Sequence, residues 1–366
     1  MVKSAKRPGQ TKTDKDPPIL SQEYLLQNQA DLVSSLCLVI MSGLLFKATR
    51  ALSAKFCMVQ HNTTNLTDPD EKAMYSTGRA DICMTLFYSL LFIAIHAVEN
   101  EYFWEKIGRR LHLSKTRMSE FMDQGSTMPF YIAIIAGAVY VFIQEDLVYN
   151  LSSIWEHTPA DSMPMLMKFY WILIMAFVLH QYPEMYFMRV KDEEMPDKII
   201  GYTAYLIPIL GAYLTGLVYP ATIILVIHCI AEVLKALSDV IECSGNGELA
   251  QPLYRLWSVA FVVARNAIAA LTVVTFFKLR GKTPDEISQL RFVACSVVLL
   301  ILLTMQIYLG GKFVQTVLSW RHQAKEVALA QKKADNFWQQ RKEQNKEAKK
   351  ARAEKRAAKE LVEKED

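Results

Sequence analysis

The 366-residue sequence lacks the short patterns that identify common metal and nucleophilic active sites. It has no HExxH or HxxxH pair and no two adjacent histidines, so a histidine-ligated metal site is not expected. It also has no GxSxG turn for a catalytic serine and no phosphate-binding P-loop. The six cysteines form no CxxC pair and no secreted disulfide spacing, which predicts that they pack as small apolar side chains.

Long apolar runs dominate what the sequence does contain. Hydrophobic residues make up 52% of the chain, although the mean hydropathy is only +0.12. The mean is low because apolar runs close to the length that crosses a bilayer alternate with polar segments as far as Trp320. We therefore predict an all-α, polytopic membrane helix bundle of about eight transmembrane helices, followed by a charged cytosolic C-terminal helix. The expected spans are 31–52, 80–100, 128–147, 165–187, 199–217, 220–237, 256–277 and 291–313.

The distribution of Lys and Arg predicts that both termini are cytosolic, because short cytosolic loops are enriched in these residues. Basic residues are concentrated in the leader 1–30, in "EKIGRRLHLSKTR" after the second span and in the tail 321–366, whereas the loop 148–164 has none. We expect four parts. They are the basic cytosolic leader 1–30, the first two spans with their lumenal loop (31–116), a membrane bundle (117–320) and the charged cytosolic tail 321–366.

The loop after the first expected span contains two overlapping glycosylation sequons in "NTTNLT", at Asn62 and Asn65. Their expected position on the far side from the termini agrees with the charge distribution, so we predict a glycan at Asn62 or Asn65. The leader is polar and has no short apolar core followed by a small-residue cleavage site. The first span is therefore expected to act as a signal anchor.

Polar side chains inside the expected spans are costly in hydrocarbon and need a reason. His180 precedes Glu184 by four residues, and His228 precedes Glu232 by four, so each pair shares one face of its helix. His96 has a comparable position in the second span, where polar residues also follow it one turn later. The repeated arrangement indicates that these faces meet in the interior of the bundle.

The seventh expected span places Arg265 and Asn266 in its middle. Intramembrane charges usually face the bundle interior or a water-filled cavity, and they usually pair. We therefore predict a polar groove, open to the cytosolic leaflet, in which Arg265 pairs with Glu232 or Glu184. The alternatives are a buried packing network without a ligand and, for Glu184, a helix cap at the membrane surface. The candidate groove residues are His96, His180, Glu184, His228, Glu232, Arg265 and Asn266.

The tail 321–366 has 14 basic and 9 acidic residues and contains neither Pro nor Gly. Its Glu-to-Lys spacings of three and four residues suit a solvated single helix. Clusters of Lys and Arg also bind RNA phosphates and anionic lipid headgroups, so contact with a ribosome or with membrane lipids is the alternative.

Four stretches resemble the translocating chain-associated membrane proteins of the endoplasmic reticulum. They are "PPILSQEYLLQNQADLVS", "IHAVENEYFWEKIGRRLHLSKTRMSEF", "MKFYWILIMAFVLHQYPEMYF" and "LYRLWSVAFVVARNAIAALTVV", and the resemblance covers nearly all of residues 17–320. It implies a multi-pass protein of the endoplasmic reticulum membrane with a TLC-type domain. It also implies a non-enzymatic role beside the Sec translocon channel, assisting the insertion of nascent signal sequences and transmembrane segments.

The wider TLC group also contains the ceramide synthases, which carry an adjacent histidine pair and two aspartates. The equivalent of the pair falls near residues 199–203, which hold no histidine, and "LHDxxD" corresponds to "IHCIAE", where Cys229 and Glu232 replace the aspartates. A thiol cannot replace a carboxylate as a general base without reworking the site. The resemblance thus implies no catalytic residue, no metal and no cofactor, with a bound phospholipid left open. The alternatives are a TLC-type ceramide synthase and another lipid-binding or lipid-moving protein.

Overall fold

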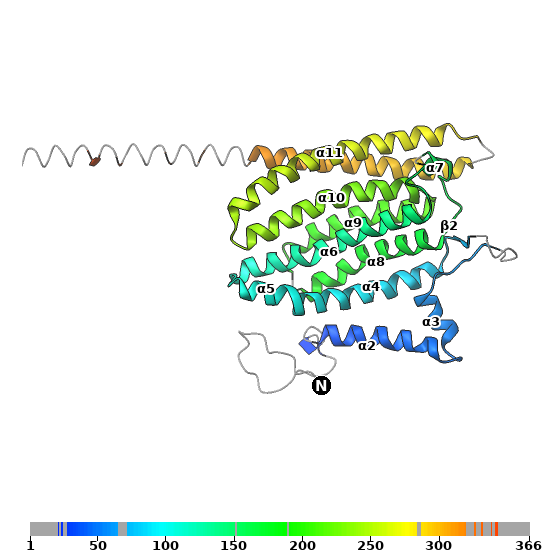
Figure 1. The fold of residues 1–366 in the computed structure, drawn as a ribbon, viewed down its shortest axis with the longest axis horizontal. Helices are drawn as coiled ribbons and strands as arrows, with labels where there is room; N and C mark the ends of the chain where they lie inside the picture. Colours follow the sequence, from blue (N-terminus) through cyan, green and yellow to red (C-terminus); the bar gives the residue numbers. More distant parts are fainter. Residues whose placement is uncertain are drawn as a thin grey trace, which may run out of the picture. The chain divides into compact units, whose positions relative to one another are not determined.

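The computed structural model describes residues 21, 23–24, 28–64, 72–150, 152–188, 190–283, 287–319, 326, 331, 338 and 341–342. These residues are almost wholly helical (Figure 1). The chain divides into two units, Met1–Gln306 and Ile307–Asp366, and the bundle described below belongs to the first. Most of the predicted leader and of the predicted tail helix lies outside the described residues.

The helices are α2 (Gln29–Ser42), the 3-10 turn η1 (Gly43–Leu45), α3 (Arg50–Cys57), α4 (Ala80–Glu99), the π-helical turn η2 (Asn100–Trp104), α5 (Glu105–Arg110), α6 (Lys115–Gln144), α7 (Ser153–Glu156), α8 (Met165–Phe187), α9 (Met195–Thr215), α10 (Val218–Cys243), α11 (Gly247–Arg280) and a further helix, Gln289–Ser319. Two short strands, β1 (Met74–Ser76) and β2 (Ser162–Pro164), pair antiparallel, with Tyr75 opposite Met163.

Among the described residues, six helices are long and apolar enough to cross a membrane. They are Ala80–Arg110, Lys115–Gln144, Met165–Phe187, Val218–Cys243, Gly247–Arg280 and Gln289–Ser319. The shortest, α8, has 23 residues. At 1.5 Å per residue it is about 35 Å long, which exceeds the roughly 30 Å of a bilayer's hydrocarbon core. The prediction of a polytopic helical membrane protein is therefore confirmed.

Two of the eight predicted spans fall outside this set of six. The first, 31–52, corresponds to the shorter apolar helix Gln29–Leu45, which ends where Phe46 adopts an extended backbone (φ −103°, ψ 128°). The fifth, 199–217, falls on α9, whose first turn carries the charged residue Asp197. The number eight accordingly stays a prediction.

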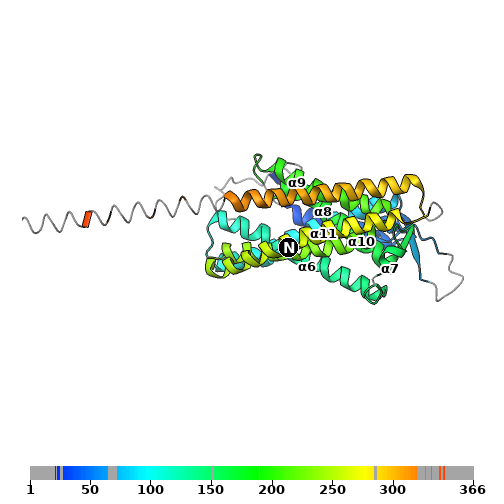
Figure 2. The same ribbon diagram turned by 90° about the horizontal axis from the view of Figure 1, so that it is seen from above.

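Helix α8 lies in the interior of the bundle. It packs against α4, α6 and α9, and 61% of its most apolar segment is buried inside the protein. Trp171 and Ile172 near its middle are 1% and 0% exposed. A helix that is apolar on every side is typical of such a position. Figures 1 and 2 show α8 among the other helices. It carries the buried residues Lys168 near its start and Glu184 near its end.

The long helix that begins as α4 contains one irregular turn. In η2 the backbone N–H of Glu105 bonds to the carbonyl of Asn100, five residues earlier. The side chains show the same spacing, since Trp104 Nε1 donates to Glu99 Oε1 at 2.8 Å. This turn inserts one extra residue into the helix and keeps Trp104 buried.

The connection between α9 and α10 is a tight hairpin, since α9 ends at Thr215 and α10 begins at Val218. Gly216 has a φ of +80°, a left-handed conformation that favours glycine. Its carbonyl accepts a hydrogen bond from the backbone N–H of Ala160 at 2.9 Å. The hairpin is thereby tied to the segment that leads into β2.

Lys168, near the start of α8, is a fully buried cation that the sequence patterns above do not indicate. Its side chain is 0% exposed, and its Nζ lies 2.8 Å from Asp81 Oδ1 of α4. The same ammonium donates to the carbonyls of Gln60 at 2.8 Å and Ser76 at 2.7 Å. Three oxygens thus surround a group that carries three N–H donors.

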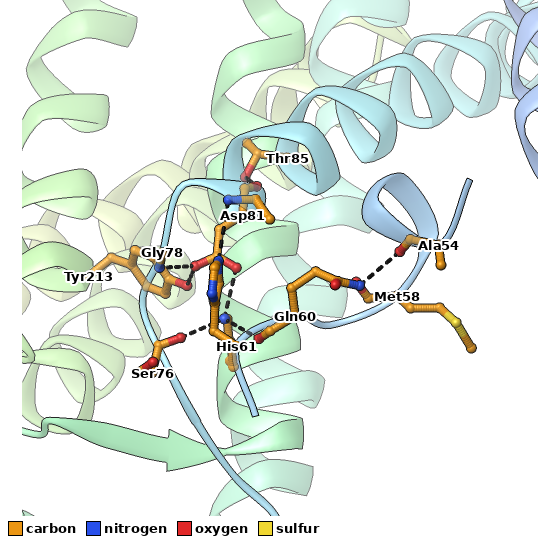
Figure 3. A network of polar contacts seen from close by, with 11 residues as sticks. Ala54, Met58, Gln60, His61, Ser76, Gly78, Asp81, Thr85 and Tyr213 are labelled. Atoms are coloured by element: carbon orange, nitrogen blue, oxygen red, sulfur yellow. Dashed lines mark hydrogen bonds and ion pairs between the residues drawn. The ribbon is translucent and has the colours of Figure 1, made fainter. Parts of the chain in front are cut away.

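The carboxylate of Asp81 is held from its other side. Its Oδ2 accepts hydrogen bonds from the backbone N–H of Gly78 and from the hydroxyl of Tyr213 in α9, both at 2.8 Å. Figure 3 shows Asp81 facing Gly78 and Tyr213, with Gln60 nearby. The Lys168–Asp81 pair therefore joins α4, α8, α9 and the chain around β1 at one end of the bundle.

Removing one partner of a buried, fully bonded ion pair typically costs about 3–5 kcal/mol, because the other charge is left uncompensated. We expect Lys168→Met to lower the free energy of unfolding by that amount and to reduce the abundance of the protein. The measurement is thermal unfolding of the purified protein in detergent. Lys72→Met is the control, since Lys72 forms an exposed ion pair with Glu145 at 3.1 Å and such pairs contribute roughly 0–1 kcal/mol. Equal unfolding temperatures for the two variants would contradict the prediction.

Candidate functional site

The structure divides the predicted groove residues between two pockets that share no lining residue. The first, the His96 pocket, lies between α4, α6, α8 and α9, and its polar lining includes His96, Asp123, His180, Glu184, Lys198 and Tyr202. The second, the Arg265 pocket, lies between α8, α9, α10, α11 and the helix Gln289–Ser319, and its polar lining includes His228, Arg265 and Gln306.

Three helices supply the polar floor of the His96 pocket. His96 of α4 places its Nε2 2.6 Å from the hydroxyl of Ser126 in α6. On its other side, Nδ1 lies 3.0 Å from Glu184 Oε1 of α8. All three residues are buried, with exposed fractions of 7%, 0% and 6%. The serine is a member that sequence patterns alone do not reveal, because a lone Ser within an apolar helix carries no signal of its partner.

His180 lies on the same face of α8 as Glu184, as their spacing of four residues predicts, but it has a different environment. Its Nδ1–H donates to the carbonyl of Phe177 in its own helix. Its ring packs against Phe177 at 5.1 Å and Phe130 at 6.0 Å between centroids, and lies 5.9 Å from the His96 ring. His180 therefore forms part of an aromatic wall beside the polar floor.

Arg265 in the middle of α11 is the centre of the second pocket. It donates to Gln306 Oε1 at 3.0 Å and to His228 Nδ1 at 2.8 Å. Glu232 Oε1 lies 3.8 Å from the guanidinium, which also packs over the ring of Phe261 at 4.7 Å. Glu232 is one of the two acidic neighbours that the sequence predicts for Arg265.

The hydrogen bond from Arg265 fixes the state of His228. A guanidinium has only donors, so the Nδ1 that it contacts must carry a lone pair and the imidazole must be neutral with its proton on Nε2. Tyr205 stacks on the ring at 5.0 Å. The rest of the pocket wall is apolar, and the cavity has a volume of about 60 Å³, which is room for a few water molecules or a short piece of an acyl chain.

Asn266 was predicted to line the groove, but it lines neither pocket. Glu232 also lies outside both linings, although it contacts Arg265. Asn266 is exposed on the other side of α11, where its side-chain amide donates to the carbonyl of Val262 at 2.8 Å. One residue along a helix turns the side chain by about 100°, so Arg265 and Asn266 cannot face the same pocket.

The remaining sequence expectations have less structural context. Asn62 is exposed next to β1, and its Oδ1 accepts from the backbone N–H of Thr64 at 2.9 Å, whereas Asn65 lies outside the described residues. Glycosylation stays a prediction. All six cysteines are free. Among the described residues, no group of three or more His, Cys, Asp and Glu side chains is placed to hold a metal ion.

Comparison with known proteins identifies the family. Residues 120–315 match the TLC domain. The chain is 30% identical over 319 residues to translocating chain-associated membrane protein 2 of Mus musculus, which covers 85% of this chain and 86% of the relative. It is 33% identical over 260 residues to the Homo sapiens protein of the same name, covering 71% of this chain and 70% of the relative. The chain belongs to the translocating chain-associated membrane protein family.

Relatives at lower identity to this chain carry the names of enzymes. A sphingosine N-acyltransferase-like protein of Alternaria alternata is 24% identical over 206 residues, covering 56% of this chain and 47% of the relative. The TLC domain is therefore shared between proteins of different names and activities, and the fold alone does not fix the function of the two pockets.

The contact between Glu232 and Arg265 can be tested by a double-mutant cycle. Glu232→Gln leaves the guanidinium without a counter-charge in the middle of the membrane, where a charged residue costs about 3 kcal/mol on insertion scales. We expect this variant to unfold at a lower temperature than the wild type. The combined Glu232→Gln and Arg265→Met variant should recover at least about 1 kcal/mol relative to the sum of the single changes.

The control is Arg255→Met, which changes an exposed arginine of the same helix. Thermal unfolding in detergent and steady-state abundance provide the readout. Additivity of the two single changes within about 0.5 kcal/mol would show that Arg265 and Glu232 do not interact.

Proposed function

We propose that this chain is a non-enzymatic accessory component of the protein translocation machinery in the endoplasmic reticulum membrane. It assists the insertion of signal sequences and transmembrane segments of nascent secretory and membrane proteins beside the Sec translocon. The main support is the similarity, over most of the chain, to two proteins named as translocating chain-associated. The distribution of basic residues supports cytosolic termini and a tail that contacts the ribosome or lipid headgroups.

The observation that carries the mechanism is that two pockets inside a bundle with an apolar surface contain charged and polar side chains. Val263 and Leu214, for example, are 61% and 63% exposed. Charged groups at membrane depth are accommodated by local thinning of the bilayer and by water that enters with them. A thinner and wetter membrane beside the bundle lowers the free energy needed to pass the polar flanks of a weakly hydrophobic segment.

The test uses vesicles reconstituted with the translocon channel and either the wild-type protein or the Glu232→Gln and Arg265→Met double variant. We expect the double variant to be folded and abundant, yet to insert weakly hydrophobic signals several-fold less well, since each 1.4 kcal/mol changes an equilibrium about tenfold. Strongly hydrophobic signals are the internal control and should insert equally with both proteins. Equal insertion of the weak signals would show that the polar residues only pack.

A second candidate function, lipid acyl transfer, is favoured by the similarity to the sphingosine N-acyltransferase-like protein. The geometry around His228 argues against it. The basic nitrogen of this imidazole already accepts a hydrogen bond from Arg265 at 2.8 Å, and the adjacent Cys229 is 1% exposed. A general base must have its lone pair within reach of the substrate proton. The lone pair of His228 Nδ1 already accepts from Arg265, so this nitrogen is not free to act as the base.

The purified protein is therefore expected to form no ceramide from a sphingoid base and an acyl-CoA. Mass spectrometry of the extracted lipids, compared with a mock membrane preparation, provides the measurement. Turnover above the mock level that disappears in His228→Ala would move the assignment to the enzyme.

A further inference from the structure

The His96 pocket contains a buried carboxylate, Glu184, that the described residues satisfy only in part. Its Oε1 lies 3.0 Å from Nδ1 of His96, which is hydrogen-bond distance. Its Oε2 is buried and has no hydrogen-bond partner among the described residues. A buried carboxylate oxygen without a hydrogen bond is costly, so the arrangement indicates a donor that binds there.

His96 can satisfy at most one oxygen of this carboxylate. Its Nε2 lies 2.6 Å from the hydroxyl of Ser126, so only Nδ1 faces Glu184. Glu184 Oε2 is then left without a donor among the described residues. The missing component is a donor that reaches this second oxygen, and a cation with several N–H groups provides one.

The pocket has the size and depth for such a cation on a lipid. Its volume is about 40 Å³, which holds roughly three water-sized groups and thus a primary ammonium with its first carbon. Glu184 lies three residues before Phe187, the end of α8, or about 5 Å along the helix axis. That position is close to the level of lipid headgroups, whereas Arg265 lies deep in its span.

The rim of the pocket carries the complementary charge. Lys198, at the start of α9, has its Nζ 3.5 Å from Asp123 Oδ2, and both side chains are partly exposed. This distance is longer than a hydrogen bond, so the lysine ammonium has N–H groups available for a phosphate oxygen. A negative floor and a positive group at the rim match a zwitterionic headgroup whose ammonium enters first.

We propose that the His96 pocket binds the ethanolamine headgroup of a phospholipid. The lipid ammonium donates to Glu184, and the phosphate contacts Lys198. Phosphatidylcholine is excluded because its quaternary ammonium has no N–H donor and three additional methyl groups. This binding goes beyond the role in translocation and does not require it.

The experiment measures lipid adducts of the full-length protein by native mass spectrometry. The protein is purified in detergent, delipidated and supplied in turn with phosphatidylethanolamine, phosphatidylcholine and phosphatidylglycerol that have identical acyl chains. We expect the ethanolamine lipid to bind at least about tenfold better than the choline lipid, because charge-assisted hydrogen bonds are lost with the latter. Equal binding of these two lipids, or preference for phosphatidylglycerol, would overturn the proposal.

The Glu184→Gln variant tests the role of Glu184 in lipid binding. It is expected to lower binding of the ethanolamine lipid about tenfold, whereas Glu194→Gln, an exposed carboxylate on the connection before α9, should bind like the wild type. Equal binding by the two variants counts against the site.

If Glu184→Gln does not fold, N-methylated and N,N-dimethylated ethanolamine lipids decide the question on the wild type. Binding must then fall with each N–H removed, and a flat series refutes the proposal. Client insertion is not part of the readout, so failure here leaves the translocation role untouched.

Discussion

The buried ion pair between Lys168 and Asp81 is the constraint on which the interior of the bundle depends. It fixes α4 against α8 at one end, and the contact between His96 and Glu184 joins the same two helices near the other end. The two contacts are separated by 15 residues in α4 and 16 in α8, or about 22 and 24 Å at 1.5 Å per residue. Parallel helices held at two matching levels cannot slide past one another. The geometry of the His96 pocket therefore depends on the Lys168–Asp81 ion pair, which lies more than 20 Å away.

The two pockets accommodate polar groups inside the membrane in different ways. Around Arg265 the protein supplies donors and acceptors itself, since His228, Gln306 and Glu232 all contact the guanidinium. Around Glu184 the described side chains leave one carboxylate oxygen without a donor. The first arrangement can persist without any ligand, and the second is incomplete without a donor. This difference explains why the deeper pocket suits a structural and membrane-perturbing role and the shallower one suits recognition of a headgroup.

Features within one helix could be predicted from the sequence, whereas contacts between helices could not. The i, i+4 pairs His180–Glu184 and His228–Glu232 could be read directly, because helical periodicity alone places each pair on one face. Six apolar segments were recognisable from length and hydropathy. The partner of His96 was not, since Ser126 is one of many serines and only the packing of α4 on α6 brings them together. Lys168 was missed because its acceptors are two backbone carbonyls and a residue 87 positions earlier, Asp81. Asn266 follows Arg265 directly in sequence, but neighbouring residues of a helix face different sides, so the two do not share a pocket.

The π-helical turn at Asn100–Trp104 also determines the rotational phase of everything that follows it in the same helix. One extra residue per turn shifts the side chains after it by about 100° relative to a continuous α-helix. With that shift, Trp104 lies against Phe121 of α6, with ring centroids 5.5 Å apart. Loss of a single residue within the turn would swing α5 and its basic residues Arg109 and Arg110 to another side of the helix while leaving His96 in place. A one-residue length change in this segment thus acts as a rotation of α5, which redirects its basic surface without altering the His96 pocket.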